Sequence, residues 1–146
     1  MRPDCPCGSG LTYEGCCGAL HQGALAESAE ALMRARYCAH VKALPAFILD
    51  SWHPDTRPEL ADIHPFIALP WMDLKVLEHK AGAKESQVTF VARYQDGDKV
   101  VFHLEKSLFL KIEGRWLFHS GTYPQPDRNA PCPCGSSRKY KACCRP

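Results

Sequence analysis

The sequence lacks the segments and motifs that would assign it to a membrane or to a common enzyme class. No apolar leader follows Met1, and the richest apolar stretch, residues 65–72, is far shorter than the roughly 20 residues that span a bilayer. A phosphate-binding glycine loop, a Ser-His-Asp arrangement, a paired-carboxylate motif and an HExxH motif are all missing. We therefore expect a cytoplasmic protein with no membrane partner. The sequence offers no catalytic residue, which favours a binding protein over an enzyme.

Cysteine, by contrast, is abundant, at nine of 146 residues. The composition, 45% hydrophobic and 23% charged, is that of a globular chain with one ordinary domain plus appendages. Disulfides seldom persist in the cytoplasm, so clustered thiols there are more often metal ligands or redox groups.

Eight of the nine cysteines form two copies of the pattern C-x-C-x8-C-C, one near each end of the chain. When residue n is aligned with residue n+127, eight of 13 positions are identical, so the chain contains an internal repeat. Four thiolates from each copy match the ligand set of a closed structural zinc site. The sequence thus predicts two zinc ions, held by Cys5, Cys7, Cys16 and Cys17 and by Cys132, Cys134, Cys143 and Cys144.

Other interpretations of the cysteines remain open. An iron–sulfur cluster also uses four thiolates, although the usual ferredoxin spacings contain C-x2-C. Simple burial of apolar thiols would need a core that a 14-residue segment lacks. Gly8 and Gly135 follow the C-x-C pairs, where a tight turn with positive φ is expected. Cys38 is expected to be a small buried hydrophobe, with a redox role as the alternative. His21 could replace one thiolate, but the second copy has no equivalent histidine.

The segment CPCGSG with its later Cys-Cys pair resembles the SEC-C zinc motif. That motif occurs at the C-terminus of the SecA translocase ATPase, where it binds zinc and serves protein–protein contact. With the middle segments 32–37 (LMRARY) and 51–54 (SWHP), the whole chain resembles the YchJ-like bacterial family. The resemblance implies that all eight terminal cysteines are ligands. It also implies a SEC-C-like motif over 1–23, a cone-shaped nuclear-transport-factor-2-like domain over 24–126 and a second SEC-C-like motif over 127–146.

The middle of the chain has an α+β pattern. Helical spacing begins after Ser28, and a second short helix is expected around residues 44–48, followed by an irregular proline-rich passage over 54–70 with one helical turn. After Trp71 the apolar period becomes two, with turn signals at 96–98 and 113–114, so antiparallel hairpins are expected. The alternation slips at residues 105–107, which predicts a bulge there.

A cone-shaped domain leaves a cavity that a small ligand or an enzymatic site could occupy. We expect Arg36, Tyr37, Trp52, His53, Trp71, His103, Glu105 and Trp116 near this cavity. His103 is the natural general base among them. A core histidine bonded to a carboxylate, and a Trp-His-Pro segment that ends a helix, are the competing structural explanations.

The formal net charge of +2 becomes about −2 if eight thiolates hold two zinc ions. Residues 127–146 carry five cations and one anion, or +4 before metal is counted. Their candidate partner contacts are Arg138, Lys139, Tyr140 and Lys141. The small overall charge argues against a dedicated nucleic-acid binder. The sequence favours a zinc-binding adaptor or chaperone-associated protein that contacts a partner protein. The alternatives are a cavity ligand or enzyme, an RNA or ribosome contact, and thiol-based sensing.

Overall fold

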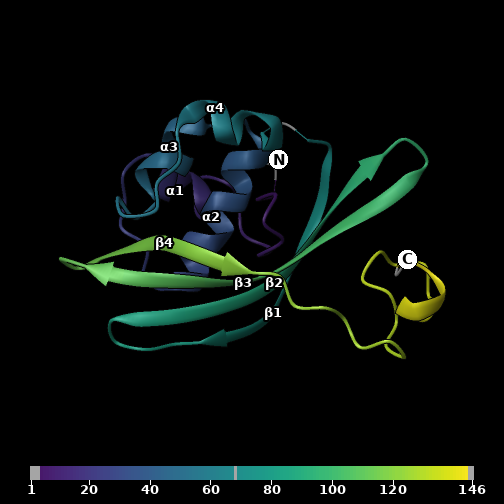
Figure 1. The fold of residues 1–146 in the computed structure, drawn as a ribbon. Helices are drawn as coiled ribbons and strands as arrows, with labels where there is room; N and C mark the ends of the chain where they lie inside the picture. The colour runs from purple at the N-terminus through teal and green to yellow at the C-terminus, as the bar shows by residue number, and fades with distance from the viewer. Residues whose placement is uncertain (1–3, 68, 145–146) are drawn as a thin grey trace.

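The structure is a computed structural model that describes residues 4–67 and 69–144. Helices α1 to α4 lie on one face of a single antiparallel sheet (Figure 1). In chain order the helices are α1 (Cys17–His21), α2 (Ala29–Val41), α3 (Pro45–Asp50), α4 (Leu60–Ile63) and two 3-10 turns, η1 (His64–Phe66) and η2 (Tyr140–Ala142). Within the described residues, no helix is long and apolar enough to cross a membrane.

The central helix α2 begins where the sequence predicts. The Ser28 side chain accepts a hydrogen bond from the Ala31 amide, and Glu30 lies in the first turn, where a negative charge favours the helix dipole. Helix α3 opens with Pro45, a residue suited to a first helical turn. Helix α3 is the expected second helix, and α4 is the expected helical turn in the proline-rich passage, so both predictions are confirmed.

The sheet has the strand order β1-β2-β3-β4, all antiparallel. The β3–β4 turn uses Glu113 and Gly114, both with positive φ, as a tight hairpin turn requires. This confirms the α+β class. The strands are β1 (Trp71–Lys80), β2 (Glu85–Asp96), β3 (Lys99–Ile112) and β4 (Arg115–Thr122).

The predicted bulge at residues 105–107 is wrong. Strand β3 pairs with β2 in unbroken register through this segment, and its one irregularity lies opposite β4, between Leu108 and Phe109. The apparent slip has another cause: polar His103, Glu105 and Ser107 point to the helical side of the sheet and line a cavity. Alternation of apolar and polar residues was therefore a poor guide to which face of β3 is inside.

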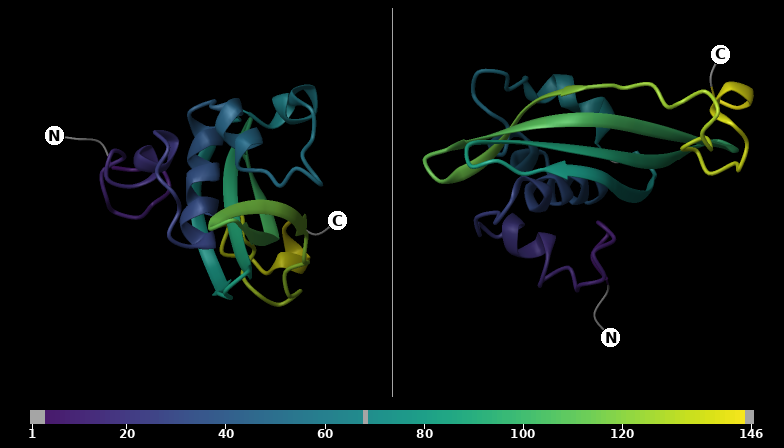
Figure 2. Two further views of the ribbon diagram at one scale, coloured as in Figure 1. Left: turned by 90° about the vertical axis from the view of Figure 1, so that its left-hand side faces the viewer. Right: turned by 90° about the horizontal axis from the view of Figure 1, so that it is seen from below.

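The two cysteine-rich ends lie on opposite sides of the sheet (Figure 2). The N-terminal end packs on α2, and its cysteines share a core cluster with Ala35 and Tyr37 of α2 and Ala92 of β2. The C-terminal end follows an extended segment after β4 and reaches the other face of the sheet, where Tyr140 contacts Phe102. One end is thus part of the core, and the other is attached to its outside.

Candidate metal centres and cavity

The C-terminal cysteines converge as predicted. The Sγ atoms of Cys132, Cys134, Cys143 and Cys144 all lie within 4.8 Å of one another. Gly135 turns the chain with a φ of 91°, and the short η2 turn returns the Cys143-Cys144 pair to the first two thiols. The Cys134 and Cys143 Sγ atoms are 3.5 Å apart, and those of Cys143 and Cys144 are 3.9 Å apart.

The N-terminal group of mutually close thiols differs from the predicted one. It consists of Cys5, Cys7, Cys17 and Cys38, again within 4.8 Å of one another, and all four are buried. Cys38 comes from the middle of α2, with its Sγ 3.4 Å from that of Cys5. Cys16 lies beside this group, 3.6 Å from the Cys7 Sγ and 3.9 Å from the Cys17 Sγ.

The sequence prediction placed Cys16 in this group and treated Cys38 as a core residue. Cys38 is indeed buried, but among thiols rather than only among hydrocarbon. It has no counterpart in the repeat and stands 21 positions after Cys17, so spacing could not reveal it. The one available signal was its position in a helix that must pack near the N-terminal motif.

Both clusters suit a tetrahedral metal ion with sulfur ligands. Zinc–sulfur bonds of about 2.3 Å place neighbouring sulfurs about 3.8 Å apart. The sulfur pairs Cys5–Cys38, Cys134–Cys143 and Cys143–Cys144 are 3.4–3.9 Å apart, and all sulfurs of each group lie within 4.8 Å of one another. Four thiols per site leave no position for a substrate water, so a metal ion here would be structural rather than catalytic.

The thiols of each group perturb one another's pKa values. Hydrogen bonds with Cys17 and Cys38 hold the pKa of Cys7 well below its usual range, while contacts with Cys38 and Cys7 raise that of Cys17. Burial opposes ionisation of Cys134, but hydrogen bonds from Ser136 and neighbouring thiols lower its pKa to about 6. Ionisation of one thiol in each group thus makes its neighbours harder to ionise. A divalent ion bound between them would stabilise all four thiolates.

A serine supports the same thiol in each copy of the repeat. The Ser9 hydroxyl lies 3.2 Å from the Cys16 Sγ and accepts a hydrogen bond from the Leu11 amide. Ser136 does the same for Cys143, at 3.1 Å, and for the amide of Arg138. The two cysteine-rich ends therefore share these local contacts.

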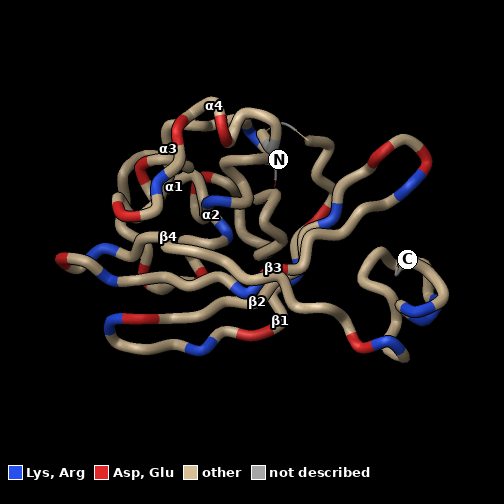
Figure 3. The backbone as a smooth tube through the Cα atoms, viewed as in Figure 1, with Lys and Arg blue, Asp and Glu red and all other residues tan. Residues whose placement is uncertain are grey.

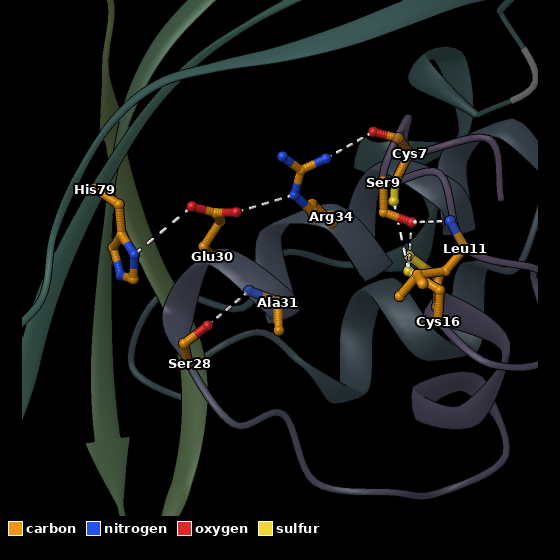
Figure 4. A network of polar contacts seen from close by, with 10 residues as sticks. Cys7, Ser9, Leu11, Cys16, Ser28, Glu30, Ala31, Arg34 and His79 are labelled. Carbon is orange, nitrogen blue, oxygen red and sulfur yellow. Dashed lines mark hydrogen bonds and ion pairs between the residues drawn. The ribbon is translucent and has the colours of Figure 1, made fainter.

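The N-terminal motif is fastened to α2 by polar contacts (Figure 4). Arg34 donates to the Cys7 carbonyl at 2.8 Å and to the Glu30 carboxylate at 3.1 Å. Glu30 in turn lies 3.7 Å from His79 of β1. His21 bonds the Tyr13 hydroxyl and the Ala35 carbonyl through its two ring nitrogens, so both nitrogens are engaged away from the thiols.

The C-terminal motif is held more lightly, by the outer face of the sheet. Arg93 donates to the Cys134 carbonyl at 3.0 Å and forms an ion pair with Asp73. The Tyr140 ring packs against Phe102, and its hydroxyl donates to Gln125. Tyr140 is consequently buried, which corrects the expectation that it faces a partner between two lysines.

Three of the four predicted contact residues remain exposed. They are Arg138, Lys139 and Lys141. Lys and Arg positions are coloured blue along the backbone of the C-terminal motif in Figure 3. We call these three residues the basic tip.

A cavity of about 570 Å³ lies between the helices and the sheet. It is lined by the predicted Arg36, Tyr37, Trp52, Trp71, His103 and Glu105. Two predicted residues are absent from its lining. The His53 ring packs beside the His119 ring and accepts a hydrogen bond from the Asp55 amide, while the His53 backbone amide donates to the Phe118 carbonyl. Trp116 is in the core cluster with Leu32 and Phe109. Local contacts with His119 and Asp55 therefore account for His53, and apolar packing accounts for Trp116.

The polar wall of the cavity comes from β3 and α2. His103 and Ser107 both bond the Glu105 carboxylate, His103 at 2.9 Å. Arg36 donates to the Ser51 hydroxyl at 2.6 Å and to the Ile48 carbonyl at 2.8 Å, and its guanidinium lies over the rings of Trp52 and Phe118. Burial lowers the pKa of Arg36 to about 9, and the nearby Glu105 charge partly opposes this. Arg36 therefore stays cationic near neutral pH.

Comparison with known proteins agrees with this arrangement. The family model "YchJ, middle NTF2-like domain" matches residues 28–121, and the SEC-C motif model matches residues 128–146. The chain belongs to the YchJ-like family. A curated relative from Serratia proteamaculans (strain 568), a UPF0225 protein, is 43% identical over 96% of both chains.

Two solved structures of SEC-C motif containing proteins share this YchJ-like fold. One, from Rhodopseudomonas palustris and determined in solution, has a TM-score of 0.78 and 33% identity, and covers 86% of this chain and 100% of its own. A crystal structure from Psychrobacter arcticus has a TM-score of 0.71 and 30% identity, with 96% and 94% covered. The YchJ-like domain and the SEC-C motif are thus found together in chains of similar length.

Proposed function

We propose that this protein is a cytoplasmic zinc-binding adaptor that contacts an acidic surface of a partner protein through the basic tip of its C-terminal motif. Each cysteine cluster holds one zinc ion in this proposal. The observation that carries it is the unequal placement of the two motifs. The N-terminal motif is built into the core, whereas the C-terminal motif lies outside the sheet with Arg138, Lys139 and Lys141 exposed.

Charge supports a protein partner more than RNA. The three cations of the basic tip can pair with carboxylates on a protein surface. A contact with single-stranded RNA would also use exposed aromatic rings, and Tyr140, the aromatic residue between the two lysines, is buried against Phe102. The tip therefore offers charge without stacking.

The adaptor proposal is tested by reversing the charge of the basic tip. The triple variant Arg138→Glu, Lys139→Glu, Lys141→Glu should lose at least about tenfold in partner capture, because complementary charges become like charges. Its zinc content is measured alongside, because the Arg138 guanidinium donates to the Cys143 Sγ at 3.6 Å. Capture is measured by crosslinking in cell extract and quantitative mass spectrometry. The matched control reverses Lys75, Lys84 and Lys99, three exposed lysines of the sheet and its loops, and changes the net charge equally.

Equal capture by the triple variant and the wild type would refute the basic tip as a contact. If ribonuclease treatment abolishes capture, and the binding weakens steeply with salt, the partner is RNA and the protein-contact proposal is wrong.

A second function, binding of a small ligand, is favoured by the cavity. Its aromatic walls and the clustered Arg36, His103 and Glu105 suit a partly apolar molecule with an anionic group. A thermal-shift screen of small carboxylates and phosphates tests this candidate. A compound that raises the melting temperature of the wild type but not of Arg36→Lys or His103→Ala would place binding in the cavity. If no compound raises the melting temperature of the wild type, the cavity candidate is refuted and the adaptor proposal is unaffected.

A further inference from the structure

Five thiols surround the N-terminal metal site, where a tetrahedral ion takes four. We propose that Cys38 of α2 is a ligand of this ion, together with Cys5, Cys7 and Cys17, and that Cys16 is a spare thiol beside it. The ion then joins the N-terminal motif to the middle domain. This inference rests on the proposed binding of zinc, and it assigns a different fourth ligand from the one that the repeat predicts.

The position of Cys38 is the first argument. Its side chain is fully buried, and its Sγ is within 4.8 Å of three other buried thiols. It points from the third turn of α2, a rigid element whose backbone is set by its own hydrogen bonds and by packing on β2. A ligand on such an element is pre-positioned, which lowers the entropic cost of forming the site.

The comparison between the two motifs is the second argument. Cys16 and Cys143 are equivalent in the repeat and have the same serine contact and nearly the same sulfur distances. Among the described residues, the C-terminal group has only its own four thiols, so Cys143 has no substitute. Cys16 does have one. It is also the most exposed of the five N-terminal thiols.

The surrounding contacts give the third argument. Arg34, one turn before Cys38 on α2, already bonds the Cys7 carbonyl at 2.8 Å. On the other side, Lys42, one turn after Cys38, places its ammonium 4.2 Å from the centre of the Tyr13 ring. Arg34, Cys38 and the C-cap Lys42, spaced one turn apart along α2 and its end, thus contact the N-terminal motif, and Cys38 is the middle contact.

The test compares two single variants and one double variant by zinc content after dialysis against a competing chelator. Cys16→Ala should retain two zinc ions per chain, because Cys16 is not one of the four proposed ligands. Cys143→Ala, the matched change in the other motif, should retain one. The double variant Cys16→Ala, Cys38→Ala should also retain one, because no fourth thiol then remains at the N-terminal site.

Cys38→Ala by itself should release its N-terminal zinc at least about tenfold faster, because Cys16 must take over from a pre-positioned ligand. Amide hydrogen exchange in residues 4–17 of Cys38→Ala should also be faster than in the wild type. Since alanine also leaves a small gap in the core, the same variant is compared in metal-free protein, where its effect on the melting temperature should be much smaller than in the zinc form.

The inference is overturned if Cys16→Ala falls to one zinc ion as Cys143→Ala does. It is also overturned if Cys38→Ala releases zinc and exchanges amides at the wild-type rates. In both cases the wild type still holds two ions, so the proposed zinc binding survives. A wild type without zinc would instead refute the proposed function itself.

Discussion

Replacing Cys7 with serine should lower the melting temperature of the whole protein by roughly 10 °C, whereas the equivalent change at Cys134 should shift the main transition by less than about 2 °C. Both changes remove a thiolate from a four-thiol site. The difference arises because Cys7 is fully buried in the cluster that packs α2 against β2, while Cys134 is half-buried in a motif outside the sheet. Cys7 also belongs to either choice of N-terminal ligands, so no spare thiol rescues it.

The expected size follows from the metal. Structural zinc in small peptides has an apparent binding free energy of about 10–16 kcal/mol near neutral pH, most of which folds the motif itself. For Cys7→Ser we expect the free energy of unfolding of the middle domain to fall by about 3–5 kcal/mol, because the N-terminal cluster and that domain share one core. For Cys134 the loss should stay within residues 128–144.

Calorimetry of the two variants, with amide exchange to locate the unfolded segment, measures this difference. Amides of 128–144 should lose protection in Cys134→Ser while those of β2 keep it. Equal melting temperatures for both variants would show that the N-terminal site is not part of the cooperative core.

Replacing Arg36 with alanine should lower the free energy of unfolding by about 3 kcal/mol. The change removes donors to Ser51 and to the Ile48 carbonyl, and leaves the perpendicular rings of Trp52 and Phe118 without the guanidinium that lies over both. It also takes away a cation that interacts with the buried Glu105 carboxylate. The free energy of unfolding of Arg36→Lys should lie between those of the wild type and Arg36→Ala, since lysine keeps a charge but loses the planar stacking.

Urea denaturation of these variants measures the loss. The control is Arg115→Ala, which removes an exposed arginine that donates to the Asp50 carbonyl, and should cost less than about 1 kcal/mol. A loss at Arg36 no larger than at Arg115 would mean that the buried guanidinium contributes little to stability.

The elements that local chemistry specifies were predictable from sequence. The cap at Ser28, the hairpin turns at Gly97 and Gly114, and the tight turn at Gly135 each depend on a few neighbouring residues. Convergence of the C-terminal thiols was predictable for the same reason, because its four cysteines lie within 13 consecutive residues.

Features that depend on distant parts of the chain were not predictable. Cys38 reaches the N-terminal thiols only because α2 packs against the motif, and this packing leaves no mark in the cysteine spacing. Tyr140 is buried by Phe102 of β3, far away in the sequence. Strand β3 misled the alternation analysis because its inward residues 103, 105 and 107 are polar and bond one another around a cavity.

The central claim is that both cysteine clusters hold zinc, and the most direct test is the metal content of the freshly purified protein. Native mass spectrometry and elemental analysis should find two zinc ions per chain, with the thiols protected from alkylation until a chelator is added. A metal-free chain whose nine cysteines all react at once, or a chain that carries iron in place of zinc, would contradict the account.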